Sequence, residues 1–283
     1  MTAAMTRQER CWEQMLRADE ANLAYFAERA ELPGVSLFFA EHEEATEFDV
    51  ALIYRTPAAD SDATLLAIGD AFHARGRIAR IRLSPLSAPA DWTRRLARGG
   101  FVADERAIYF SVPRSLQVRA NPLVDIARVT SRADADQFSA IQVIGFAIPL
   151  AQQEWDRLLA RRHLADQRHL FYLASLAGRV VGAARCIHLP NHMATMACLA
   201  THPDARGHGV GTSLLARMIA DARARKNRVV CGAVVPGSDA ARLYARLGFA
   251  FHFATTTFRE PPGARMAPIP GANRALHVPP ARS

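Results

Sequence analysis

The stretch LATHPDARGHGVGTSLLARMIADA, residues 199–222, decides the fold. It begins at the end of an apolar, strand-like run over residues 193–200, and from about residue 209 its apolar side chains recur at helical spacing to about residue 224. Between the two, Arg206 is followed by glycines at alternate positions, Gly207, Gly209 and Gly211. The segment therefore predicts a strand that turns through a glycine-rich loop into an amphipathic helix.

This loop has the features of a diphosphate-binding site. Glycines let the backbone turn tightly and approach a ligand, the N–H groups at a helix N-terminus favour an anion, and Arg206 can contact phosphate with two parallel hydrogen bonds. The dinucleotide fingerprint does not fit, because the spacing here is G-x-G-x-G and lies late in the chain. A Walker loop does not fit either, because the loop has no lysine.

The loop resembles motif A of the GCN5-related N-acetyltransferases (GNAT), R/Q-x-x-G-x-G/A. Further on, AARLYARLGF at residues 240–249 resembles that family's A-x-x-L-Y-x-x-x-G-F segment. The resemblance covers about residues 124–258. It implies an acetyl-CoA-dependent acyltransferase that moves an acetyl or short acyl group to an amine of a small molecule or peptide. The alternative is a non-catalytic acyl-CoA-binding or sensing module with the same fold.

The resemblance also implies a role for individual residues. Backbone amides of the loop and first helical turn would hold the pyrophosphate of acetyl-CoA, the cosubstrate. The end of the preceding strand would pair with pantetheine and polarise the thioester carbonyl, and Tyr244 would protonate the leaving thiolate as the catalytic acid. The implied cofactor-binding residues are Leu199, Ala200, Thr201, Arg206, Gly207, His208, Gly209, Val210, Gly211, Thr212, Ala240 and Tyr244. No metal is expected.

The match departs from the family pattern in two places. Relatives often carry Asn seven residues before the tyrosine, where this chain has Gly237. Several relatives also carry a glutamate on the strand before the loop as general base, but residues 193–199 contain no carboxylate. His188, His192, a water chain and an already neutral amine all remain open as ways to deprotonate the acceptor.

The four cysteines, Cys11, Cys186, Cys198 and Cys231, form no C-x-x-C pair, and three lie in apolar strand-like runs. Reduced thiols in a reducing compartment explain this pattern best. A zinc site formed by the two histidines and nearby cysteines is disfavoured, because a Pro-Asn turn separates His188 from His192.

The first half of the chain resembles the second only as a degenerate copy. Asp62 opens a helix 39 residues before the Gly-Phe pair ending at Phe101, and Gly209 opens one 40 residues before the pair ending at Phe249. The matching loop, residues 55–62, has no glycine, a proline that removes one N–H, and two aspartates that would repel pyrophosphate. Leu96 stands at the position of Tyr244. One CoA site per chain is therefore predicted.

The predicted fold class is α/β, with two tandem acetyltransferase-like (GNAT) domains, each a mixed, mostly antiparallel sheet flanked by helices. The predicted division is a degenerate domain over residues 1–112, a linker with prolines at both ends over 113–122, a GNAT domain over 123–260, and a Pro-rich tail over 261–283. The apolar spacing near the N-terminus predicts a first helix over residues 7–30.

Composition limits the partners. Among 283 residues, 35 basic and 27 acidic side chains give a net charge of +8, but the arginines are dispersed and Lys226 is the only lysine. Nucleic acid is disfavoured, because its sites usually combine basic clusters with aromatics. The longest apolar stretch, residues 140–151, is broken and too short to span a bilayer, and the first residues do not resemble a secretory signal. We expect a cytoplasmic, bacterial-like protein with no membrane partner, and leave a homodimer open.

Overall fold

The computed structural model describes residues 5–261, which divide into two compact units. Unit 1 comprises residues 5–13, 26–108 and 253–261, and unit 2 comprises residues 14–25 and 109–252. Three elements have residues in both units: α1 (Arg7–Leu23), β5 (Val102–Ser111) and β11 (Ala250–Arg259). The boundaries 1–112, 113–122 and 123–260 remain a prediction about the two copies, since the compact units cut across them. Apart from Pro261, the predicted tail lies outside the described residues.

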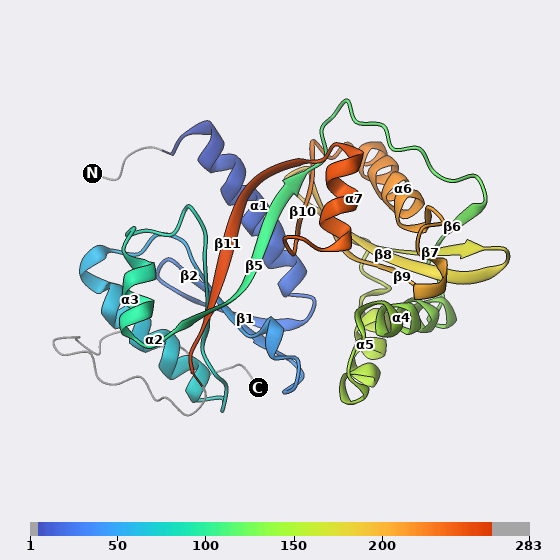
Figure 1. Ribbon diagram of the computed structural model, residues 1–283. Coiled ribbons are helices and arrows are strands. Elements are labelled where there is room, and N and C mark those ends of the chain that lie inside the picture. The colour runs from blue at the N-terminus through green and yellow to red at the C-terminus, as the bar shows by residue number, and fades with distance from the viewer. Residues whose placement is uncertain (1–4, 262–283) are drawn as a thin grey trace. The chain divides into compact units, whose positions relative to one another are not determined.

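Unit 2 contains a sheet in the order β10-β9-β8-β7-β6. Neighbouring strands from β6 to β9 are antiparallel, whereas β9 and β10 are parallel. Helices α4 and α5 cover one face of this sheet and α6 covers the other (Figure 1). The elements are β6 (Val124–Arg128), α4 (Arg132–Phe146), α5 (Leu150–His163), β7 (His169–Leu176), β8 (Arg179–Leu189), β9 (Met193–Thr201), α6 (Val210–Ala224), β10 (Val229–Val234) and α7 (Asp239–Leu247), with a 3-10 turn at Pro203–Ala205.

Local sequence signals explain where these helices begin and end. The Ser131 side chain caps α4 by accepting a hydrogen bond from the Asp134 N–H. In turn, the Asp134 side chain accepts a hydrogen bond from the Ser131 N–H. Ser238 caps α7 in the same way from the Ala241 N–H. Gly248, with φ 87°, ends α7 in the left-handed conformation that glycine adopts at little cost. The apolar faces of α6 and α7 then pack with β6 to β10 in one core.

Unit 1 repeats part of this plan. Its strand order is β1-β2-β3-β4-β11, with β3 and β4 parallel and the other pairs antiparallel. The elements are β1 (Ala27–Leu32), β2 (Val35–Ala40), β3 (Val50–Ile53), α2 (Ser61–His73), β4 (Arg80–Leu83) and α3 (Trp92–Arg98), with 3-10 turns at Thr46–Phe48 and Ala58–Asp60. The order β3-α2-β4-α3-β5 matches β9-α6-β10-α7-β11, including the parallel pair. The predicted fold class is confirmed.

The predicted first helix over residues 7–30 is wrong over its last seven residues, 24–30. α1 ends at Leu23, and residues 27–32 form β1, which pairs with β2 across a two-residue turn. The turn depends on Gly34, whose φ is +75° and whose missing Cβ would lie 2.1 Å from the Arg55 carbonyl oxygen. Pairing along the whole of β2 therefore outweighs the helical preference of the segment AERAEL.

None of the described helices combines the length and the apolarity that crossing a bilayer requires. The four cysteines form no disulfide within the described residues, and Cys186 and Cys231 are buried.

Candidate active site

The predicted pantetheine-binding strand contains a β-bulge. The register of β8 with β9 pairs Arg185 with Ala197 but Ala183 with Ala200, so one residue of β8 faces two of β9. Cys198 lies at the bulge in a left-handed conformation, with φ 55°. The Gln142 side chain, from α4, donates a 2.8 Å hydrogen bond to the Cys198 carbonyl oxygen. The bulge is thus held from the helical face and turns the backbone of Leu199 relative to the start of the strand.

Beyond the bulge, β9 separates from its other neighbour. β9 and β10 pair only where Met193–Thr195 lie beside Val229–Cys231. After Thr195, no described residue of β9 pairs with β10. Ala200 and Thr201 therefore keep their β8 partners on one side, Leu199 lies in the bulge, and the side of all three toward β10 has no strand partner. Backbone groups left open in this way can pair with an extended ligand.

The glycine-rich loop leads from this strand end into the first turn of α6. Gly207 and Gly209 have φ +81° and +76°, a conformation that suits glycine. Gly209 is the N-cap of α6 and makes no side-chain cap, so the first N–H groups of the helix, including those of Gly211 and Thr212, face no capping side chain. Such a helix start favours an anion. The residues present therefore fit a pyrophosphate group.

Gly211 brings the predicted residues into one place. A Cβ built on it would lie 3.5 Å from Leu243, 3.8 Å from the Thr201 hydroxyl and 4.0 Å from the Leu199 side chain. These are ordinary contact distances, so the protein itself has room for a methyl group here. The strand end, the first turn of α6 and helix α7 thus meet at Gly211.

Tyr244, the predicted acid, lies on α7 and is 6% exposed. Its ring packs on Phe110 and Phe249, with centroids 4.7 and 5.0 Å away. Burial raises the pKa of the phenol above its ordinary value near 10, so the hydroxyl keeps its proton at neutral and mildly alkaline pH. Ala240 lies one turn earlier on the same helix and is half-buried.

Arg206 and His208 are exposed on the loop. The His208 ring lies 3.0 Å from the Arg206 carbonyl oxygen through Nδ1, and the Arg206 side chain points to no described carboxylate. Both side chains are therefore available to a ligand at the start of α6, as the sequence predicts for the cofactor-binding set. Val210 is buried in the core, so its side chain is not accessible to a ligand.

Asn121 was not predicted as a loop residue. It lies in the irregular segment 113–122, and its side-chain amide donates a 2.9 Å hydrogen bond to the His208 carbonyl oxygen. Its backbone N–H donates to the Ser213 hydroxyl at 2.9 Å. The predicted linker is therefore packed on unit 2 and supports the loop. No sequence motif marks Asn121, because the contact joins residues 87 positions apart.

The two histidines considered as bases lie at the other end of β9. His188 pairs with Ala194, and His192 precedes the strand. Ala194 is five residues before Leu199, which corresponds to about 16 Å along a strand. Burial, with the nearby Arg225, lowers the pKa of His188 to about 4, and its Nδ1 lies 2.8 Å from the Asn227 amide nitrogen. The structure does not bring either histidine to the predicted reaction centre.

A buried polar cluster lies on the α4–α5 face of the sheet, near Cys198. Arg185 is fully buried, with its guanidinium 3.6 Å above the Tyr25 ring and hydrogen-bonded to Asn22. Asp156, from α5, accepts a 2.5 Å hydrogen bond from the Ser139 hydroxyl, and burial raises its pKa. Sequence reasoning missed this cluster, because its members come from four separate elements and the turn after α1.

One group of described side chains has metal-ligand spacing: His163, Asp166 and His169, whose ligand atoms lie within 4.8 Å of one another. Both Asp166 oxygens already accept hydrogen bonds from the Arg168 guanidinium. Burial and the neighbouring Arg185 lower the pKa of His169 to about 3. The positive surroundings therefore disfavour a cation at this group, which is separate from the glycine loop.

The equivalent strand end in unit 1 is closed. The Thr56 N–H donates to the Ala88 carbonyl oxygen at 2.9 Å, and the Ala88 N–H donates to the Tyr54 carbonyl oxygen at 2.7 Å. The Ser87 hydroxyl adds a 2.6 Å bond to the Ile53 carbonyl oxygen. Leu96, the counterpart of Tyr244, is a fully buried core residue. After β3, the backbone groups are thus hydrogen-bonded within unit 1. The equivalent backbone groups at the end of β9 have no strand partner toward β10.

The fold and the site define the class of protein: an acetyltransferase-like α/β protein in which an uncapped, glycine-rich helix start lies next to an open strand end. Residues 136–249 match the model of the acetyltransferase (GNAT) family. Residues 136–249 are therefore similar to this family, and the resemblance inferred from the motifs of the chain is confirmed.

Solved structures with the same fold cover most of the chain. A GCN5-related N-acetyltransferase from Kribbella flavida is 19% identical with a TM-score of 0.71, over 92% of this chain and 98% of that one. A tandem GNAT protein from the clavulanic acid biosynthesis pathway is 16% identical with a TM-score of 0.61, over 82% and 79%. A GCN5-related N-acetyltransferase from Sphaerobacter thermophilus is 14% identical with a TM-score of 0.59, over 80% of each chain. No curated protein sequence matches the chain.

Proposed function

We propose that unit 2 transfers an acetyl or other short acyl group from coenzyme A to an amine of a small molecule or peptide. The observation that carries the proposal is the separation of β9 from β10 beyond the Cys198 bulge, next to the glycine start of α6. An anion-binding helix start and an open strand edge at one place suit a pyrophosphate joined to an amide-containing arm.

The chain's own groups divide the chemistry. Amides from Gly207 to Thr212 bind the pyrophosphate, with Arg206 adding charge. The backbone from Leu199 to Thr201 pairs with the pantetheine arm, and an N–H there polarises the thioester carbonyl. Bound acetyl-CoA supplies the activated acyl group. Tyr244, kept protonated by burial, donates its proton to the departing sulfur.

The acceptor amine loses its proton to water or arrives neutral, because β9 carries no carboxylate and both candidate histidines lie at its far end. This lack of a base on β9 also favours a second candidate function, a non-catalytic acyl-CoA-binding or sensing module. The two differ in whether any amine gives turnover.

Calorimetric titration of the whole chain with acetyl-CoA tests the proposal. We expect one site per chain, because unit 2 has the open strand end and unit 1 has a closed one. A matched pair of variants checks the site: Gly207→Ala and Gly178→Ala both place alanine at positive φ with no atom within 4 Å. Similar losses of stability are expected, but only Gly207→Ala weakens acetyl-CoA binding.

Thioester cleavage is then followed over a panel of amines. Turnover with any amine supports the transferase. Binding without turnover supports the sensing module, and no binding at all contradicts both. Two sites per chain would overturn the interpretation of the loop at residues 55–62.

A further inference from the structure

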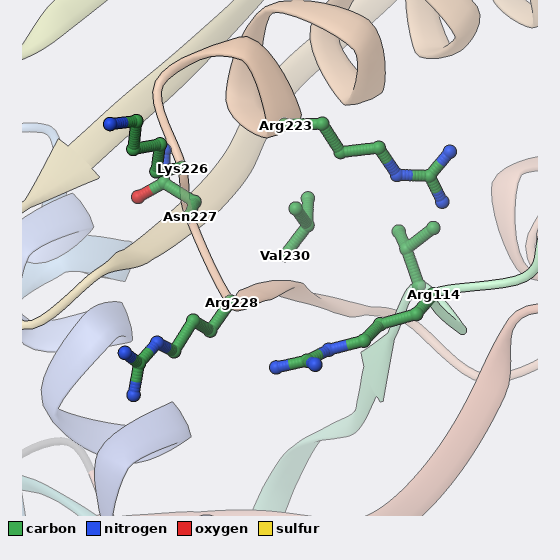
Figure 2. A pocket seen from close by; sticks show the side chains of 7 residues that line it. Arg114, Arg223, Lys226, Asn227, Arg228 and Val230 are labelled. Atoms are coloured by element: carbon green, nitrogen blue, oxygen red, sulfur yellow. The ribbon is translucent and has the colours of Figure 1, made fainter.

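We propose that unit 2 carries a second anion site, in a cavity beside the C-terminal end of α6, and that its ligand is a small phosphorylated molecule bearing at least two phosphate groups. The cavity has a volume of about 350 Å³. Four of the residues that line it are cationic: Arg114, Arg223, Lys226 and Arg228. Figure 2 shows Arg223 near the end of α6 with its side chain on one side of Val230, Lys226 and Arg228 on the following loop with their side chains on the other side, and Arg114 entering from another segment.

The four cations come from three separate parts of the chain. Arg223 lies in the last turn of α6, Lys226 and Arg228 lie between α6 and β10, and Arg114 lies in the irregular segment 113–122. Cations at the end of a helix are favoured by its dipole. That effect accounts for Arg223 and Lys226 but not for Arg114 and Arg228, which line the same cavity.

No acidic side chain lines the cavity. Within residues 5–261, the side chains of Arg114, Lys226 and Arg228 make no hydrogen bond or ion pair. Arg223 donates through one nitrogen to the Pro113 and Leu116 carbonyl oxygens, at 3.1 and 2.8 Å, and thereby ties the segment that carries Arg114 to the helix. Four like charges without a counter-charge repel each other, and a multiply charged anion would relieve this repulsion.

The floor of the cavity is apolar and fixed. Val112 and Val230 line it, and the Val112 N–H donates a 2.8 Å hydrogen bond to the Val230 carbonyl oxygen. Asn227, the remaining lining residue, is held by bonds from its amide to the Ala222 carbonyl oxygen and to His188. The cations therefore line a cavity with a fixed base, and their long, exposed side chains would turn toward a ligand.

The chemistry of the lining selects the class of ligand. Guanidinium groups match phosphate with paired hydrogen bonds, and Lys226 adds a compact charge. A volume near 350 Å³ is at the lower end of small-molecule sites. Single-stranded nucleic acid is usually held by aromatic rings that stack on the bases, and no aromatic residue lines this cavity. A compact bisphosphate or diphosphate fits better than a polymer.

This site is separate from the glycine loop. The loop lies at the start of α6 and the cavity at its end, and the 15 residues of the helix span about 22 Å. One phosphate group cannot occupy both. The inference goes beyond the proposed acyl transfer and does not depend on it.

Inorganic pyrophosphate is the probe for the test. The whole chain is titrated calorimetrically at constant ionic strength, once alone and once with saturating CoA. With CoA present we expect one pyrophosphate per chain. The double variant Lys226→Gln/Arg228→Gln should weaken that binding at least about tenfold, whereas Arg132→Gln, an exposed arginine of unit 2 outside the cavity, should leave it unchanged.

Three results would overturn the proposal. The first is an absence of pyrophosphate binding at millimolar concentration, in the presence and absence of CoA. The second is an equal loss of affinity in Arg132→Gln, which would indicate general charge attraction. The third is tighter binding of a single-stranded oligonucleotide than of pyrophosphate that also depends on Lys226 and Arg228, which would identify a nucleic-acid surface. Failure of acyl transfer alone would leave the pyrophosphate result intact.

Discussion

At the scale of single residues, Tyr244 has a fixed ring and a raised pKa. Tyr244→Phe keeps the contacts with Phe110 and Phe249 but removes the proton donor. We expect kcat to fall about 100-fold, a typical contribution of a positioned acid, while the Kd for acetyl-CoA changes less than about twofold. Steady-state thioester cleavage and calorimetry measure the two quantities. Unchanged turnover would remove Tyr244 from the mechanism.

His169 makes a prediction about pH. Its pKa is lowered to about 3 in the folded chain, chiefly by burial and then by Arg185, and rises to about 6.5 on unfolding. A group with a lowered folded pKa stabilises the fold above about pH 6.5, and this stability is lost as the pH falls toward 3. His169→Phe should keep the ring contacts with Tyr25 and Phe171.

When the pH is lowered from 7.5 to 5, the free energy of unfolding of the natural chain should fall. We expect this fall to be about 2 kcal/mol smaller in His169→Phe. Urea unfolding at the two pH values measures the difference. An identical loss in both proteins would mean that His169 already accepts a proton in the folded state.

At the scale of elements, a substitution in the first turn of α6 can distinguish an effect on stability from an effect on ligand binding. A methyl group on Gly211 meets its neighbours at ordinary contact distances, and alanine favours a helix by up to about 1 kcal/mol over glycine. Gly211→Ala should therefore raise Tm or leave it unchanged. It should also weaken acetyl-CoA binding, because the methyl group occupies space that the ligand needs.

Thermal unfolding and calorimetry on the same Gly211→Ala preparation make this comparison. If stability and affinity both fall, the glycine serves the fold. If neither falls, the pyrophosphate does not lie against this turn.

Most elements of the second half were predictable because their signals are local. The apolar run at residues 229–234 coincides with β10, and the glycine loop predicts a helix from about residue 209, one residue before the observed start of α6. The error at residues 27–32 arose because AERAEL favours a helix in isolation, and only its partner β2 makes it a strand. Local patterns carry no information about such a partner.

The candidate site was predictable to the same extent. The glycine loop, the strand end and Tyr244 are marked by motifs, and Gly211 joins them in the structure. Gln142, Asn121 and the Cys198 bulge were not predictable, because each acts through a contact with a distant segment. The cavity at the end of α6 was hidden for the same reason, since its four cations appear in the sequence as dispersed charge.

At the scale of the whole molecule, the last strand has residues in both units. Residues 256–259 of β11 pair with β4, and the buried Glu260 carboxylate lies 2.7 Å from the His73 ring nitrogen within unit 1. Truncation after His252 should therefore expose the edge of β4 and make unit 1 the first part cleaved by a protease. Truncation after Pro261 is the matched control and should leave the cleavage pattern unchanged.

Limited proteolysis with mass spectrometry distinguishes the two truncations, and acetyl-CoA titration of the shorter chain should still give one site. Equal resistance of both truncated chains would show that β4 does not need its β11 partner.

The same sharing of β11 has a consequence for synthesis on the ribosome. Unit 1 contains the earliest described residues, yet its sheet lacks the strand beside β4 until residues 253–260 have been made. Domains usually fold as they emerge, from the N-terminus onward. Here the nascent first unit carries an open strand edge throughout translation of unit 2, and such an edge invites wrong pairing. Unit 1 is thus begun first and completed last. We expect that chaperones, or slow folding of unit 1, prevent wrong pairing at the open edge of β4 until β11 has been made.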